Sequence, residues 1–147
     1  MKRLLPPYLF FLSVLAMLAV HRYLPLWHGE FSPWNHLGWL AILGGLGLAI
    51  IGKRLFANRQ TNIKTFNDPQ TLVTEGPFRL SRNPMYLGFL LALIGIAIVL
   101  QGLSPFLVVL AFFLITDFWY IRFEEARMRA IFGDDYENYC LRTRRWI

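Results

Sequence analysis

An arginine-containing loop and a pair of acids stand at the two ends of a long uncharged stretch of this chain. The loop is TLVTEGPFRLSRNPMYLG, residues 71–88, and the acids are Glu124 and Glu125. Asn83-Pro84 predicts a helix start, with Asn as the cap and Pro in the first helical position, directly after Arg82. A helix start carries partial positive charge and backbone N–H donors, so an anionic group such as a carboxylate is favoured there. These residues predict a site for a charged ligand, although the arginines would also suit lipid phosphate.

The uncharged run that follows, Asn83–Thr116, is too long for a single membrane crossing, which needs about 20 apolar residues. Gln101-Gly102-Leu103-Ser104-Pro105 supplies a break, because Gly and Pro interrupt helices. We therefore predict a helical hairpin with legs over residues 84–100 and 105–122, which match in length within a turn. This geometry places Tyr86 level with residues 119–122 and the acid pair just beyond them.

Three acids of this region have alternative explanations. Asp117 is predicted about a turn inside the membrane edge, where an acid needs a partner or a function. An ion pair with Arg82 or Arg54 explains it as well as contact with a ligand does. For the acid pair the alternatives to ligand contact are ion pairs with Arg127 and Arg129, or simple solvation.

The composition indicates an all-α integral membrane protein. The chain has 147 residues, of which 56% are hydrophobic, and this is too apolar for an ordinary soluble domain. Charges avoid Leu4–Val20 and Phe31–Gly52 as well as the run Asn83–Thr116. We predict one membrane domain, 1–147, with four transmembrane helices. Residues 1–61 hold two generic spans, and 62–147 hold the hairpin and the ligand-binding region. The first span is predicted to be uncleaved, since no small-x-small cleavage site precedes His21.

The distribution of basic residues predicts the orientation. Of the 15 Lys and Arg residues, all but Arg22 fall on one side if both termini are cytoplasmic. We therefore expect a multi-pass protein of the inner (plasma) membrane with its site facing the cytoplasm. The net charge of +6 follows from this topology and from anionic lipids, so no nucleic-acid partner is predicted.

Two further patterns concern packing. Ala41, Gly45 and Ala49, four apart in the second span (about Leu37 to Phe56), predict close approach to another helix. After the hairpin, Glu124–Phe132 is predicted to continue as a helix that Gly133 ends. Asp134 should then cap a second short interfacial helix, with the arginines of Arg142-Thr143-Arg144-Arg145 in the headgroup region.

The spaced motifs resemble a known family. GPFRLSRNPMYLG, the apolar hairpin, the acid pair and FGDDYENY followed by RRW are similar to the isoprenylcysteine carboxyl methyltransferase family, and phospholipid methyltransferases have a related catalytic region. The resemblance covers roughly Asn62–Ile147. The family often has His where this chain has Asn83, which puts an imidazole-specific role in doubt.

The resemblance implies S-adenosylmethionine-dependent methylation of a lipophilic acceptor at the cytoplasmic membrane face. A carboxylate, thiol or amine acceptor remains open, as does the oligomeric state. Arg82 and Glu125 are the candidate catalytic residues, no residue stands out as a base, and no metal site is predicted. Two alternatives are an NADPH-dependent reductase of the related sterol reductase fold and a non-catalytic membrane adaptor. The implied cofactor-binding residues are Leu72, Val73, Gly76, Pro77, Phe78, Arg82, Asn83, Pro84, Tyr86, Glu124 and Glu125.

Overall fold

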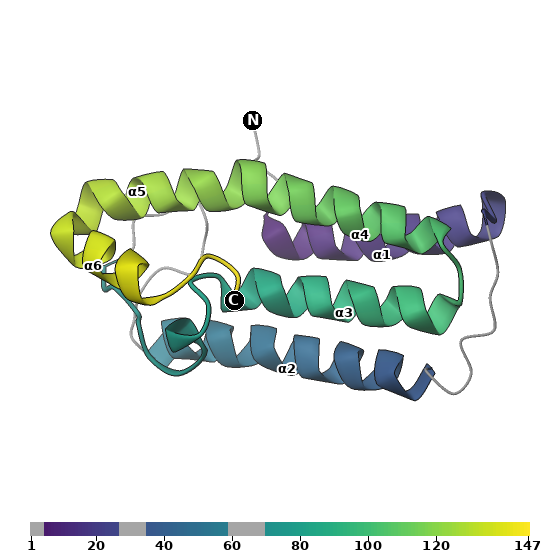
Figure 1. Ribbon diagram of the computed structural model, residues 1–147, viewed down its shortest axis with the longest axis horizontal. Helices are drawn as coiled ribbons and strands as arrows, with labels where there is room; N and C mark the ends of the chain where they lie inside the picture. The colour runs from purple at the N-terminus through teal and green to yellow at the C-terminus, as the bar shows by residue number, and fades with distance from the viewer. Residues whose placement is uncertain (1–4, 27–34, 59–69) are drawn as a thin grey trace.

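The computed structural model describes residues 5–26, 35–58 and 70–147, and these form helices joined by loops (Figure 1). The long helices are α1 (Pro6–Tyr23), α2 (Asn35–Asn58), α3 (Pro84–Leu100) and α4 (Ser104–Ile115). The all-α prediction is confirmed for this part of the chain. The predicted boundary between residues 61 and 62 lies outside the described residues.

Within the described residues, two helices are long and apolar enough to cross a membrane. They are α2 and the continuous helix Ser104–Phe132, with mean hydropathies of 1.7 and 1.9. α3 is apolar but has only 17 residues, and α1 ends in the polar residues His21 and Arg22. A membrane protein with helical spans is therefore supported. The count of four spans and the orientation in the membrane stay predictions.

The predicted close approach of the second span is confirmed, and its partner is α3. Gly45 lies so near this helix that a Cβ atom would come within 2.6 Å of the backbone nitrogen of Ala92. Gly95 approaches α2 equally closely, since its Cβ would lie 2.8 Å from the Ile42 nitrogen. Small residues allow this backbone contact, and van der Waals packing drives helix association in lipid.

The predicted hairpin is also confirmed. α3 ends at Leu100, Gln101 adopts the left-handed conformation (φ 55°), and α4 begins at Ser104 with a proline in its first turn. The second leg continues through a π-helical turn, η2 (Thr116–Ile121), into α5 (Arg122–Phe132). At about 1.5 Å per residue the rod Ser104–Phe132 measures roughly 43 Å, whereas the hydrocarbon core is about 30 Å thick. The rod is therefore longer than this layer is thick, and α5 is its polar end.

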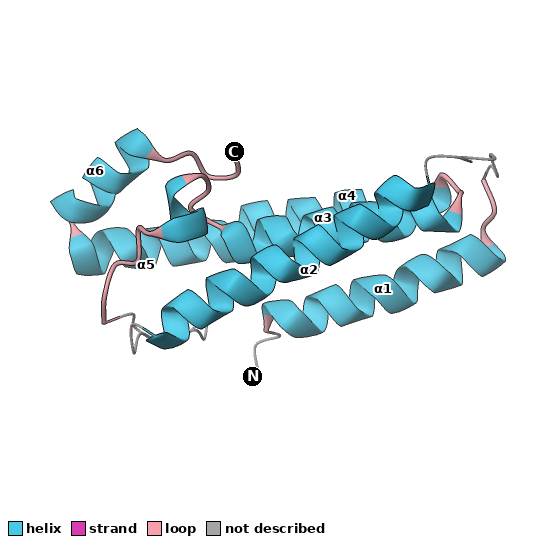
Figure 2. Cartoon of the chain, turned by 90° about the horizontal axis from the view of Figure 1, so that it is seen from below, coloured by secondary structure: helices cyan, strands magenta, loops and turns pink. Residues whose placement is uncertain are grey.

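The polar end of the molecule is completed by α6 (Asp134–Arg142), which folds back beside α5 (Figure 2). Gly133 ends α5 as predicted, with φ 49°. The prediction that Asp134 caps α6 is wrong, because Gly133 occupies the cap position and Asp134 is already helical. The carbonyl of Gly133 accepts the Tyr136 and Glu137 N–H groups, at 3.1 and 3.2 Å, so the helix begins one residue earlier.

Candidate functional site

The two acids of the pair have different partners. The Tyr86 hydroxyl donates a hydrogen bond of 2.9 Å to Glu124 Oε1. The ring of Tyr86 also lies beside that of Tyr120, with 6.3 Å between centroids. Tyr86 is therefore level with the end of the second leg, as the hairpin geometry predicts. Glu124 thus joins two buried tyrosines, one from α3 and one from η2.

Glu125 is buried among guanidinium groups. It is 3% exposed. Its Oε1 lies 3.1 Å from Arg82 Nη2 and also accepts a hydrogen bond from Arg145 Nε at 3.1 Å. Its Oε2 accepts one from Arg145 Nη2 at 2.7 Å, and Arg129 stands at 3.9 Å. Simple solvation is thus the wrong explanation for Glu125. Its closest partners are Arg82, in the segment that precedes α3, and Arg145, in the C-terminal tail.

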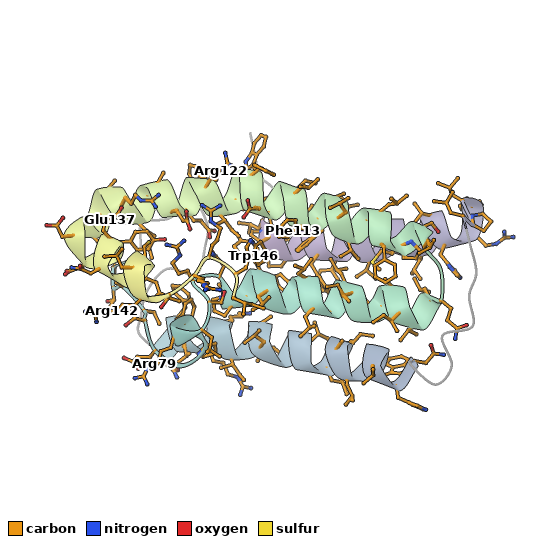
Figure 3. The ribbon with its side chains drawn as sticks, in the orientation of Figure 1. Arg79, Phe113, Arg122, Glu137, Arg142 and Trp146 are labelled. Atoms are coloured by element: carbon orange, nitrogen blue, oxygen red, sulfur yellow. The ribbon has the colours of Figure 1, made fainter. Side chains whose placement is uncertain are left out.

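Asp117 also pairs with the tail. Arg145 Nη1 donates to its two oxygens at 3.3 and 3.4 Å, and the Trp146 indole N–H donates to Oδ1 at 2.9 Å. The predicted alternatives Arg82 and Arg54 are therefore wrong as ion-pair partners. The indole packs on Phe113, with ring centroids 5.1 Å apart (Figure 3). Asp117 lies in the π-helical turn, a feature that often marks functional positions in helices.

The tail is bonded to the segment that leads into α3. Arg82 N–H donates to the Arg144 carbonyl at 3.0 Å, and the Asn83 side-chain amide donates to the Arg145 carbonyl at 3.0 Å. Pro84 holds the first helical position as predicted, but Asn83 makes no side-chain cap. Asn83 does hold the N-cap position, but its side-chain amide binds the tail, so only the side-chain cap of that prediction is wrong. The Ser81 hydroxyl accepts the Asn83 N–H at 3.1 Å.

The side chain of Arg82 contains an N–H donor without a hydrogen-bond partner among the described residues. This donor is Nε, which is buried. The side chain as a whole is 12% exposed. Buried polar groups in proteins are almost always paired, so an unpaired guanidinium N–H is well suited to an anionic ligand. The predicted use of Arg82 for a carboxylate fits this geometry.

Other predicted residues lie in a separate apolar cluster. Val73 and Phe78 are buried against Tyr136 and Tyr139 of α6, and Leu72 packs on the same cluster. Their side chains serve packing, while the Phe78 carbonyl accepts the Tyr139 hydroxyl at 2.6 Å. Burial raises the pKa of the Tyr139 phenol well above its ordinary value.

The turn that links this cluster to Arg82 contains the remaining two predicted residues. Gly76 has φ 56°, a backbone conformation that other residues rarely adopt, and Pro77 follows it in the short 3-10 helix η1 (Gly76–Arg79). Both residues shape the chain between the apolar cluster and Arg82.

The sequence around this site matches the model of a known protein family. The family model described as phospholipid methyltransferase matches residues 34–135, more than half of the chain. The chain belongs to the phospholipid methyltransferase family. No curated protein and no solved structure matches it.

Membership of the phospholipid methyltransferase family implies S-adenosylmethionine-dependent methylation of a lipid. It confirms the predicted resemblance to phospholipid methyltransferases, while the narrower resemblance to isoprenylcysteine carboxyl methyltransferases stays a prediction. The matched range contains Arg82, Tyr86, Asp117 and the acid pair. Arg145 and Trp146 lie beyond it.

The contacts of the tail with the acids of the rod do not follow from the sequence pattern. Arg145 is a partner of two acids, and the placement of the tail arginines in the headgroup region stays a prediction. The motif RRW is part of the family resemblance. Nothing in its spacing says that the chain reverses after Arg142 and reaches α4.

An open polar cleft of about 540 Å³ is lined by Tyr139 and lies between α6 and the segment that contains η1. Arg79 and Arg142, both shown in Figure 3, stand on its two walls together with Glu75 and Asp135. The cleft borders the predicted segment Leu72–Phe78 and has the size of a small-molecule site.

Proposed function

We propose that this chain transfers a methyl group from S-adenosylmethionine to the head-group amine of a phospholipid, at the cytoplasmic face of the membrane. The observation that carries the proposal is the unpaired, buried Nε of Arg82 beside the start of α3. A donor of that kind suits the carboxylate of the cofactor. The family supplies the reaction class and the lipid nature of the acceptor.

The residues around Arg82 divide the work. Arg82 and the start of α3 bind the carboxylate, with Arg82 held in place by the carboxylate of Glu125 at 3.1 Å. Glu124, Tyr86 and Tyr120 offer a carboxylate and two aromatic faces, which attract a cation such as a sulfonium or an ammonium. Glu125 acts through Arg82, because arginines already engage both of its oxygens.

S-adenosylmethionine supplies an electrophilic methyl group, and its transfer to an amine forms a C–N bond, breaks a C–S bond and releases one proton. The leaving group is S-adenosylhomocysteine, and an ammonium head group must give that proton to water at the membrane surface before its nitrogen can attack. Glu124 is the carboxylate nearest to the two aromatic rings, so it is the residue we assign to hold the ammonium. Positioning and exclusion of water can supply most of the rate enhancement of such a displacement.

The acceptor reaches this site along the apolar surface of the rod. Leu107, Leu110 and Leu114 of α4 are exposed, and so are Phe118 and Trp119 at its polar end. A helix with such a surface belongs in lipid, and Trp suits the headgroup level. A phospholipid lying along the rod presents its head group near η2 and α5, where the acids are.

The test is methyl transfer from radiolabelled S-adenosylmethionine by the purified protein in vesicles. We expect label in phosphatidylethanolamine and none in phosphatidylcholine, whose quaternary nitrogen cannot accept a methyl group. Arg82→Gln should abolish the transfer. Label found only in a farnesylcysteine analogue would overturn the amine acceptor and support the narrower isoprenylcysteine resemblance. Cofactor binding without transfer to any acceptor would support the adaptor alternative.

A further inference from the structure

The last residues of the chain return to the site by a defined path. After α6 the backbone becomes extended at Thr143 (φ −133°, ψ 129°), and the Arg144 and Arg145 carbonyls bind the segment before α3. The Ser81 hydroxyl also donates to the Arg145 carbonyl, at 3.3 Å. The tail is therefore bonded to residues 81–83, the segment that contains Arg82.

The Arg145 side chain then joins two acids that lie on different turns of the rod. Its Nε and Nη2 bind Glu125 at 3.1 and 2.7 Å, and its Nη1 binds Asp117 at 3.3 Å. A guanidinium is a planar fork, so two bonds on one edge fix the carboxylate plane as well as its position. Arg145 thus dictates how the Glu125 carboxylate faces its other partner.

That other partner is Arg82, which contacts Glu125 through Nη2 and not through Nε. Arg82 Nη2 lies 3.1 Å from Oε1, the oxygen that Arg145 Nε also binds at 3.1 Å, while Oε2 is taken by Arg145. Arg82 Nε consequently has no partner among the described residues. A carboxylate released from Arg145 would be free to bind Arg82 with both oxygens, since bidentate pairing is the preferred geometry.

We propose that Arg145 is a positioning residue, which holds Glu125 against Nη2 of Arg82 and so keeps Arg82 Nε available for the carboxylate of the cofactor. This rests on the proposed function. Without Arg145, Glu125 turns onto Arg82, occupies Nε and competes with the cofactor. Trp146 has a different task, because its bond to Asp117 and its contact with Phe113 anchor the tail without touching Glu125.

The experiment measures S-adenosylhomocysteine affinity by calorimetry on the detergent-solubilised full chain, together with thermal stability. Arg145→Gln should weaken binding about tenfold, the usual effect of losing one hydrogen bond to a charged group. Arg145→Lys, which keeps the charge but not the fork, should lie between this variant and the parent and guards against a misfolded Gln variant. Arg144→Gln removes the same charge from the exposed neighbouring side chain and should bind like the parent.

Two comparisons separate positioning from mere stabilisation. Trp146→Phe should lower thermal stability while leaving affinity within about twofold of the parent. In a Glu125→Gln background, Arg145→Gln should weaken binding by less than about twofold further, because the competing carboxylate is gone. A purely structural Arg145 would give affinity losses that follow the loss of thermal stability in all variants, Trp146→Phe included.

Failure of the positioning role is distinguishable from failure of the proposed function. A folded parent that does not bind S-adenosylhomocysteine overturns the proposed function and the positioning role with it. If the parent binds S-adenosylhomocysteine, and folded Arg145→Lys and Arg145→Gln variants bind it as tightly as the parent does, the positioning role alone is overturned.

Discussion

The Arg145 guanidinium holds the Glu125 carboxylate through two hydrogen bonds, of 3.1 Å to Oε1 and 2.7 Å to Oε2, across 20 residues of sequence. The hydrogen bond to Glu125 raises the pKa of Arg145, which is charged in any case. This pair connects the end of the chain to the rod Ser104–Phe132 and to Arg82. Glu125 is therefore a support for the site, and Glu124 is the acid that faces the aromatic side chains.

Glu125→Gln should weaken S-adenosylmethionine binding ten- to a hundredfold. The amide cannot balance Arg82 and Arg145, so Arg82 loses its fixed position, and a hydrogen bond involving a charged group is worth about 1.5–3 kcal/mol. Unfolding stability should also fall, because two partly buried guanidinium groups lose their acid. Calorimetric titration and thermal unfolding measure the two effects.

The matched control is Arg122→Gln. Arg122 lies on the same helix but is exposed, with its guanidinium over the ring of Phe118 at 4.5 Å, and Figure 3 shows it on the outer side of the rod. It should change affinity by less than twofold. If Glu124→Gln and Glu125→Gln both bind cofactor like the parent, the assignment of the site to the acid pair is wrong.

Glu124→Gln should act on turnover more than on cofactor affinity. The amide oxygen can still accept the Tyr86 hydroxyl, which preserves the 2.9 Å contact, but the negative charge that attracts an ammonium is lost. We expect kcat/KM for phosphatidylethanolamine to fall by about tenfold or more. Tyr86→Phe removes only the hydroxyl, so its kcat/KM should fall less than that of Glu124→Gln. A Glu124→Gln enzyme with parental kcat/KM would remove Glu124 from the acceptor site.

The elements and the hairpin could be predicted because they follow from local rules. The break at Gln101–Pro105 needs only the helix-interrupting residues, and the level of Tyr86 needs only the rise per residue. The contact of Tyr86 with Glu124 confirms that arithmetic. The approach of Gly45 to α3 was readable in the same way from small residues four apart.

The partners of Asp117 and Asn83 could not be predicted, because both belong to the tail. Asn83 is a good helix cap by type, yet its side chain makes no cap hydrogen bond and donates instead to a carbonyl 62 positions away. The predicted topology places several arginines near Asp117. Only the reversal of the chain after α6 brings Arg145 to it. Local propensity carries no information on such long-range choices.

Gly45→Ala should destabilise the fold, whereas Gly44→Ala should not. A Cβ on Gly45 would stand 2.6 Å from the Ala92 nitrogen and would push α2 and α3 apart, at a cost of about 1–3 kcal/mol. A Cβ on Gly44 meets nothing within 4 Å. Thermal unfolding in detergent compares the two. Equal stabilities would contradict the close packing of α2 on α3.

Stability should fall at alkaline pH through Tyr139. Burial raises the pKa of its phenol in the folded state, while in the unfolded chain the pKa is about 10. Above pH about 10 the folded protein keeps a proton that the unfolded chain releases, so the stabilisation is complete below that pH and is lost as the pH rises. Thermal unfolding at pH about 9 and about 11 should show this loss, and Tyr139→Phe should reduce it. An unchanged slope in that variant would assign the loss to other groups.

The central claim is that Arg82 holds the carboxylate of S-adenosylmethionine, and ligand-induced thermal stabilisation tests it most directly. At a hundredfold excess over Kd, S-adenosylhomocysteine should stabilise the solubilised parent by about 2.7 kcal/mol, which raises Tm by several degrees. NADPH should have no effect, and Arg82→Gln should lose most of the shift at the same ligand concentration. A folded parent with no shift, or a folded Arg82→Gln variant with the full parental shift, would contradict the account.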